Sequence, residues 1–212
     1  MVKFLLTAFF CIFVTLPAYA TDKESVYERV MRTGTIKCGY GLWSIYLDKN
    51  PNTGEMSGIF YDYMETLGDR LSLKIEWTEE IGWGDFIAAL ENNRFDAYCT
   101  IVGYNAERAR EIDYLSPLFY LGADAFVKAG DTRFDNNIQG ANAPDVTMAT
   151  IEGDLYSKIS VRDYPLSQKY EMPQLATQAE LFLSVANGKA DITITETSAG
   201  EEFMESNPGK IR

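Results

Sequence analysis

Short apolar runs and longer stretches of helical periodicity alternate along the first half of the sequence, and this alternation constrains the fold more than any single motif. Runs rich in apolar and β-branched residues predict strands, whereas apolar residues three and four positions apart predict helices. Strands that alternate with helices pair in parallel through right-handed crossovers, so the sequence predicts an α/β fold. The elements expected in this half are helices at 22–32, 58–70 and 83–90, and strands at 35–40, 73–77 and 97–102.

The second half repeats the pattern after a long extended run at 118–127. A helix is expected at 179–186, and the polar turn Asn187–Asp191 leads from it into a strand at 192–195. The same order of helix, polar turn, aspartate and strand occurs around Asn92–Asp96 in the first half. Two similar α/β units are therefore expected. This half is also expected to hold a strand at 146–150 and a helix that begins near residue 155.

The first twenty residues are typical of a secretory signal peptide. Lys3 supplies the positive charge, residues 4–16 form the apolar region, and Pro17–Ala20 ends in the small residues that signal peptidase prefers. Cleavage after Ala20 would place the rest of the chain in an exported, oxidising compartment. The alternative is an uncleaved membrane anchor, for which the apolar run is short.

Composition excludes several classes of function. The chain has 19 basic and 31 acidic residues and a formal charge of −12, which argues against binding to nucleic acid or to anionic lipid. It has no histidine, so histidine general bases and histidine-containing zinc sites are excluded. No cofactor loop, metal cluster or activated nucleophile is recognised, and no cofactor is expected. Cys38 and Cys99 are expected on two strands, either as a disulfide or as two buried thiols.

Arg108 is the residue that most suggests a binding site. Asn105 is a natural N-cap, so a helix is expected to begin there and to place Arg108 near its positive end. A cation at that end is disfavoured by about 0.3–1 kcal/mol, and a bound anion would offset this cost. A guanidinium also suits a carboxylate because it donates two parallel hydrogen bonds. The alternative is that Arg108 pairs with Glu111 or another surface acid.

The spacing of Asp96, the run Asn105–Arg108 and the run Asp113–Pro117 resembles the motif of the bacterial extracellular solute-binding proteins of family 3. Gly58 and Asp62 match a second family pattern, in which Phe60 replaces an acid. The resemblance implies the type II periplasmic binding fold, with two lobes that are each a mainly parallel sheet flanked by helices. The implied organisation is a signal peptide at 1–20, lobe 1 at 21–118 and lobe 2 at 119–212, with a hinge crossing along 118–127.

The resemblance also implies residue roles at the carboxyl ends of the strands. Arg108 would hold the carboxylate of the solute and Glu196 its ammonium group, while Tyr40 and Trp43 would form walls for the side chain. Asp154 stands where the family has threonine, and it either faces a cationic group or caps the following helix. The full set of expected ligand-binding residues is Tyr40, Trp43, Thr100, Val102, Arg108, Gly153, Asp154, Leu155 and Glu196.

The function implied is that of a periplasmic receptor for an ABC importer. It would bind an amino acid or a similar zwitterion between its lobes and deliver it, as a monomer, to an inner-membrane permease. Two alternatives remain: a dehydratase-like enzyme on the same fold that uses Asp154 or Glu196 as acid or base, and a sensory domain of a signalling protein. The resemblance covers the first four-fifths of such a receptor, so lobe 1 is expected to lack a C-terminal return.

Overall fold

A computed structural model of the chain describes residues 24–212. The signal peptide expected at 1–20 lies outside the described residues. None of the helices between residues 24 and 212 has the length and apolar character that a membrane span requires.

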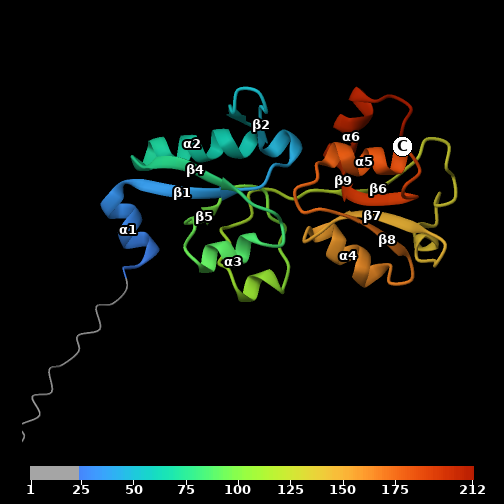
Figure 1. Cartoon of the computed structure of the whole chain (residues 1–212), viewed down its shortest axis with the longest axis horizontal. Coiled ribbons are helices and arrows are strands. Elements are labelled where there is room, and N and C mark those ends of the chain that lie inside the picture. The colour runs from blue at the N-terminus through green and yellow to red at the C-terminus, as the bar shows by residue number, and fades with distance from the viewer. Residues whose placement is uncertain (1–23) are drawn as a thin grey trace, which may run out of the picture.

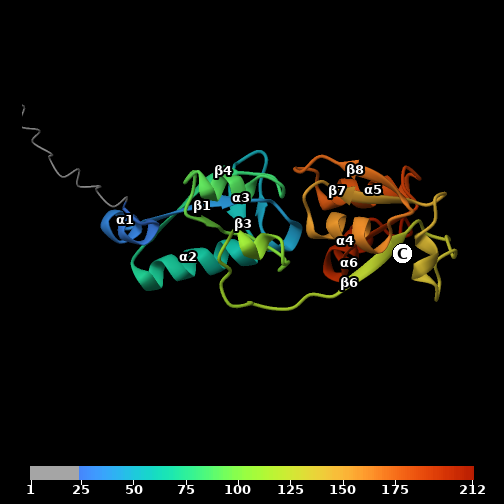
Figure 2. The same ribbon diagram turned by 90° about the horizontal axis from the view of Figure 1, so that it is seen from below.

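Two α/β lobes lie side by side, and an extended segment that precedes strand β6 crosses from one to the other (Figures 1 and 2). We call the part built on the sheet with strand order β4-β1-β5 lobe 1, and the part built on the sheet with order β6-β9-β7-β8 lobe 2. The predicted α/β class and two-lobed architecture are confirmed.

Lobe 1 follows the predicted alternation closely. Strand β1 pairs in parallel with β4 and with β5. The strands of this lobe are β1 (Thr35–Tyr40), β4 (Lys74–Glu80), β5 (Ala97–Tyr98) and the small antiparallel pair β2 (Asp48–Lys49) and β3 (Met56–Ser57). Its helices are α1 (Val26–Thr33), α2 (Ile59–Leu71) and α3 (Phe86–Glu91), with 3-10 turns η1 (Ser44–Tyr46) and η2 (Arg108–Arg110).

Two predictions in lobe 1 were wrong in extent. The strand expected at 97–102 ends at Tyr98, because the chain turns where the Thr100 hydroxyl donates to the Gly41 carbonyl at 2.9 Å. The helix expected from Asn105 is only the short turn η2, although Asn105 does accept a hydrogen bond from the Arg108 amide at 2.8 Å. A turn of three residues carries little macrodipole, so the electrostatic argument for an anion beside a helix start does not hold.

Lobe 2 contains two elements that the sequence did not reveal, β8 and α6. Strand β6 is antiparallel to β9, and the other pairings of the sheet are parallel. The extended run expected at 118–127 forms a strand only in its second half. The strands are β6 (Ala123–Val127), β7 (Thr147–Ile151), β8 (Gln168–Met172) and β9 (Ile192–Glu196). The helices are α4 (Leu155–Asp163), α5 (Gln178–Ala186) and α6 (Thr197–Ser206), with the 3-10 turn η3 (Ile138–Ala141).

The aspartate that recurs in both halves of the sequence has the same structural role in both lobes. Asp96 accepts a hydrogen bond from the Lys37 amide of the neighbouring strand at 2.9 Å, and Asp191 accepts one from the Thr147 amide at 2.8 Å. Each is also paired with an arginine, Arg29 in lobe 1 and Arg133 in lobe 2. The repeated motif therefore joins the start of one strand to the next strand in the sheet, and it has no direct part in the site.

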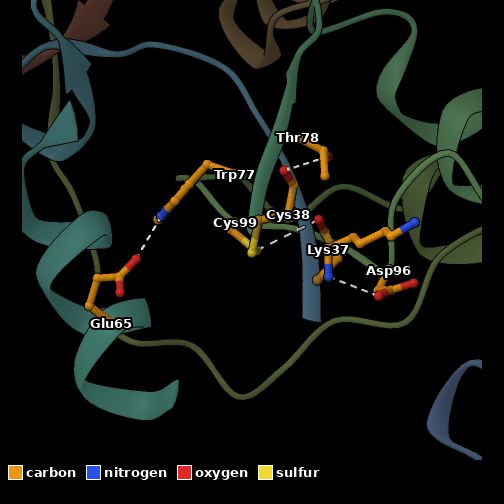
Figure 3. The surroundings of a disulfide bond; sticks show 8 residues. Lys37, Cys38, Glu65, Trp77, Thr78, Asp96 and Cys99 are labelled. Atoms are coloured by element: carbon orange, nitrogen blue, oxygen red, sulfur yellow. Dashed lines mark hydrogen bonds between the residues drawn. A yellow bond between two sulfur atoms is a disulfide. The ribbon is translucent and has the colours of Figure 1, made fainter. Parts of the chain in front are cut away.

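Cys38 and Cys99 form a disulfide, which decides between the two alternatives left open by the sequence. Figure 3 shows the bond beside the start of the short strand pairing between β1 and β5. Because β5 has only two residues, the covalent link adds substantially to what holds this edge of the sheet. The disulfide also lies directly before the loop that leads to Arg108.

Candidate functional site

The carboxyl ends of β1, β7 and β9 meet where the two lobes touch. Gly153, which follows β7, has a φ of +77°, and a Cβ at this position would lie 2.4 Å from the Gly84 amide nitrogen of lobe 1. The Tyr46 hydroxyl of lobe 1 lies 2.9 Å from the Ser198 hydroxyl of lobe 2. The lobes are thus in direct contact, and ligands of open α/β sheets bind at such strand ends.

Arg108 extends from lobe 1 to lobe 2 and is only 3% exposed. Its Nη2 donates to the Gly153 carbonyl at 2.7 Å and to the Trp83 carbonyl at 3.4 Å. The guanidinium carbon lies 5.1 Å from the centre of the Phe86 ring. Among the described residues, no carboxylate is within ion-pair distance of Arg108, so the alternative of a surface pair with Glu111 is excluded. A buried guanidinium without an anion is costly by several kcal/mol, and a bound carboxylate would relieve this cost.

Glu196 is the corresponding charged group of lobe 2. It lies at the end of β9, is 7% exposed, and its Oε2 accepts a hydrogen bond from Trp43 Nε1 of lobe 1 at 3.1 Å. Thr195 Oγ1 and Gln178 Nε2 donate to the same oxygen at 2.9 and 3.4 Å. Burial raises the pKa of Glu196, and hydrogen bonds from its own backbone, Thr195 and Trp43 oppose the rise.

Asp154 adds a second buried carboxylate to the site. It caps α4, because its Oδ1 accepts a hydrogen bond from the Tyr156 amide at 3.2 Å. Burial, followed by the negative charge of Glu196, raises the pKa of Asp154 to about 7, while the Tyr156 amide and Arg108 oppose the rise. Burial and the charge of Glu196 also raise the pKa of Tyr156. The capping alternative is therefore correct for Asp154, and its side chain is nevertheless part of the buried charge cluster.

Four other predicted residues make contacts outside this charge cluster. Leu155 is half-buried and lies against Gly103 of lobe 1. The Thr100 hydroxyl is engaged by the Gly41 carbonyl, and Val102 packs on the apolar cluster that contains Phe86 and Phe95. Tyr40 has its contacts within lobe 1: its hydroxyl accepts from Lys49 Nζ at 3.0 Å, and its ring meets Trp77 edge-on. Roles for these four in ligand binding remain predictions.

A cavity of about 480 Å³ lies between the lobes next to the charged groups. Trp43 and Gln178 line it and also donate to Glu196. Trp83 lines it as well, and its backbone carbonyl accepts from Arg108. The volume is typical of a site for a small organic molecule. The cavity and the charge cluster are therefore two parts of one interlobe site.

Sequence reasoning missed three residues of this site, Trp83, Gln178 and Tyr156. Trp83 follows β4 at its carboxyl end, as Trp43 follows β1, so the rule that singled out Trp43 would also have found it. Tyr156 lies in the first turn of α4 after β7. Gln178 follows β8, which was not predicted, so no strand end marked its position.

The site has the chemistry of a solute-binding pocket. It offers a guanidinium for an anion, two carboxylates for a cation and aromatic walls for an apolar part. Within residues 24–212, no group of three or more acidic, cysteine or histidine side chains is placed to hold a metal ion.

Residues 44–172 match the family described as bacterial extracellular solute-binding proteins, family 3. No curated protein matches the sequence of the chain.

Several solved structures share the fold at low sequence identity. An ancestral amino-acid-binding protein, described as a precursor of cyclohexadienyl dehydratase, superposes with a TM-score of 0.78 and 23% identity over 86% of this chain and 80% of its own. An ancestral arginine-binding protein bound to arginine superposes with a TM-score of 0.72 and 18% identity over 84% of this chain and 77% of its own. A putative ABC-transporter binding component from Wolinella succinogenes, complexed with lysine, superposes with a TM-score of 0.72 and 20% identity over 82% of this chain and 73% of its own. At these identities the likeness shows the type II periplasmic binding fold. Because the family match spans more than half of its residues, the chain belongs to the bacterial extracellular solute-binding proteins of family 3.

Proposed function

We propose that the protein is a periplasmic receptor that binds an amino acid between its lobes and delivers it to the inner-membrane permease of an ABC importer. The observation that carries the proposal is the pair of buried charges at the lobe boundary. Arg108 comes from lobe 1 and reaches the backbone of lobe 2, while Glu196 comes from lobe 2 and accepts from Trp43 of lobe 1. A zwitterion brings one charge of each sign, and burial requires that both be matched.

In this proposal Arg108 binds the α-carboxylate of the solute and Glu196 binds its ammonium group. Asp154 adds negative charge beside the ammonium, and Trp43 and Trp83 bound the space for the side chain. The lobes separate to admit the solute and close upon it, with the crossing segment before β6 as the hinge. The signal peptide at 1–20 directs export, and the closed form is recognised by the permease as a monomer.

The test is titration calorimetry of the purified protein against the twenty amino acids, followed by the Arg108→Ala variant with any solute that binds. Loss of one partner of a buried charge pair costs about 2–5 kcal/mol, so affinity is expected to fall by at least about 30-fold. The matched control is Arg110→Ala, because Arg110 lies on the same turn η2 but is exposed. If Arg108→Ala binds as tightly as the control, the carboxylate assignment fails.

A second candidate is a dehydratase-like enzyme that acts on a small organic acid. The observation that favours it is Asp154, a buried carboxyl whose pKa is raised to about 7, which is suitable for a general acid. Mass spectrometry of each bound solute after prolonged incubation separates the two functions. A receptor returns its solute unchanged, whereas turnover of any solute would establish the enzyme.

A further inference from the structure

The charges and hydrogen-bonding groups of the interlobe cavity next to Glu196 indicate which class of solute it accepts, which the family match does not specify. It is bounded by the aromatic rings of Trp43, Trp83 and Phe182. The acids Asp48, Glu80 and Glu202 lie at its wall, and among the described residues that line it none is lysine or arginine. Aromatic faces and carboxylates attract cations, so the surroundings of the cavity are selective by charge.

Gln178 supplies an independent indication of what fills the cavity. Its side chain is 6% exposed, and its Nε2 donates to the Glu196 carboxylate at 3.4 Å. Because an ionised carboxylate only accepts hydrogen bonds, this contact fixes the orientation of the amide and leaves Oε1 on the other side. Oε1 is buried and has no hydrogen-bond partner. A buried acceptor without a partner costs about 1–3 kcal/mol, and a solute donor that reaches Oε1 when the lobes close on it would relieve this cost.

Three donors on the cavity wall are already engaged within the protein, which disfavours a solute that needs to accept hydrogen bonds from them. The Thr177 hydroxyl donates to Glu180 Oε2 at 3.0 Å, and Asn207 Nδ2 donates to the Phe203 carbonyl at 3.1 Å. Trp43 Nε1 is occupied by Glu196. A side chain that ends in N–H groups and carries positive charge fits these surroundings better than a neutral amide, which also has a carbonyl to satisfy.

The charges beside the cavity lead to the same conclusion. Arg108 contributes +1, and Asp154 and Glu196 contribute −1 each when ionised, so the sum of the three buried groups is −1 when both carboxyls are ionised, the state that a bound cation favours. A neutral zwitterion leaves that excess in place, whereas a solute with a net charge of +1 removes it. Since unmatched buried charge is strongly disfavoured, the cluster also selects for a cation.

We infer that the solute is a cationic amino acid whose terminal guanidinium or ammonium group occupies the cavity lined by Trp43 and Trp83. This inference rests on the proposed function and narrows it to one class of solute. The α-carboxylate and α-ammonium groups bind at Arg108 and Glu196, and the long side chain passes Gln178 into the cavity.

The experiment compares arginine with citrulline by titration calorimetry on the purified protein. These two amino acids have nearly the same shape, but citrulline replaces the cationic guanidinium by a neutral urea. Arginine is expected to bind at least tenfold more tightly, which corresponds to about 1.4 kcal/mol. Agmatine, which is arginine without its carboxylate, measures the contribution of the Arg108 end separately, and weaker binding than arginine is expected.

A double variant, Asp48→Asn with Glu80→Gln, tests the cavity itself. Both acids are exposed at the cavity wall, so the fold should tolerate the changes, and the preference for arginine over citrulline is expected to fall by about threefold or more at low salt. The matched control is Glu55→Gln in the nearby exposed loop, which should keep the full preference.

The possible outcomes separate the inference from the function beneath it. If arginine and citrulline bind equally, or if only neutral amino acids bind, the inference is wrong and the receptor proposal stands. If no amino acid binds at all, both fail. A preference for arginine that the double variant leaves intact would overturn the assignment of the cationic group to this cavity.

Discussion

The two lobes bring opposite charges to their boundary, but they hold them in different ways. In lobe 2, Glu196 ends β9, a strand that lies between β6 and β7 in the sheet. In lobe 1, Arg108 lies on the short turn η2, in a loop that follows the two-residue strand β5. The position of the anion is therefore fixed by a sheet, and the position of the cation by a loop with local supports.

This difference indicates which contacts each charge depends on. Glu196 is surrounded by side-chain donors from both lobes, so its charge is already partly stabilised. Arg108 donates to backbone carbonyls, and its loop is secured by the Asn105 cap and by the nearby disulfide at Cys99. Perturbations of lobe 1 are therefore expected to have larger effects than comparable changes in lobe 2.

The largest effect is expected from loss of the Cys38–Cys99 disulfide. The bond closes a loop with a sequence separation of 61 residues, and the loss of such a link lowers the free energy of unfolding by about 2–5 kcal/mol. Urea unfolding of the Cys38→Ala, Cys99→Ala double variant measures this change. All three tryptophans, Trp43, Trp77 and Trp83, lie in lobe 1, so their fluorescence reports on the affected lobe.

Far-ultraviolet circular dichroism, which sums over the helices and strands of both lobes, supplies the comparison with the whole chain. The fluorescence transition is expected to move to lower urea more than the dichroism transition does. Reductant should reproduce this shift in the parent protein and have no effect on the double variant. Equal shifts of both transitions would show that the two lobes unfold as one unit.

A smaller effect is expected for Glu196→Gln. The substitution keeps an acceptor for Trp43 but removes the charge that faces the ammonium group of the solute. Affinity for an amino acid is expected to fall by about 10- to 100-fold, less than for Arg108→Ala, because Asp154 retains negative charge in the cluster. Calorimetry measures both, with the exposed Glu205→Gln on the following helix α6 as the control. A larger loss for Glu196→Gln than for Arg108→Ala would reverse the comparison between the lobes.

A pH dependence of stability that arises from Asp154 is also expected. Its pKa is raised from 3.8 to about 7 in the folded state, so between these values the folded protein binds more protons than the unfolded chain. The free energy of unfolding therefore falls as pH rises through this window. Asp154→Asn preserves an N-cap and removes the titrating carboxyl. The fall in melting temperature between pH 5 and pH 7.5 should therefore be smaller in this variant than in the parent protein.

Glu196 has a raised pKa of the same sign, so some of the slope should persist in Asp154→Asn. Asp145→Asn, at an exposed position, is the control and should keep the full slope. An unchanged slope in Asp154→Asn would mean that Asp154 is not the group that titrates.

Much of the fold was accessible from the sequence because the signals were local. The strand at 35–40 and the helix that ends near 70 were found with correct type and nearly correct bounds. The repeated helix, turn, aspartate and strand showed that the chain contains two similar units, and the aspartates Asp96 and Asp191 proved to join neighbouring strands. Arg108 and Glu196 were singled out as candidates, and the structure places both, buried, at the lobe boundary.

The failures have a common physical cause, which is that tertiary contacts overrode weak local signals. Strand β8 consists largely of polar residues and is a strand because β7 pairs with it. Helix α6 contains Gly200, which disfavours a helix locally, but a Cβ there would lie 2.0 Å from the Phe126 ring, so close packing requires the glycine.

The sequence by itself determined the alternation of elements, the family resemblance and the identity of the charged residues, because periodicity and motif spacing are properties of the chain. Only the tertiary structure decided that Cys38 and Cys99 are joined, that Asp154 caps a helix while sharing a buried cluster with Glu196, and that Gln178 faces a cavity. These features depend on the burial and proximity of residues far apart in the chain. Burial and proximity set pKa values and hydrogen-bond partners, and they arise only when the lobes pack together.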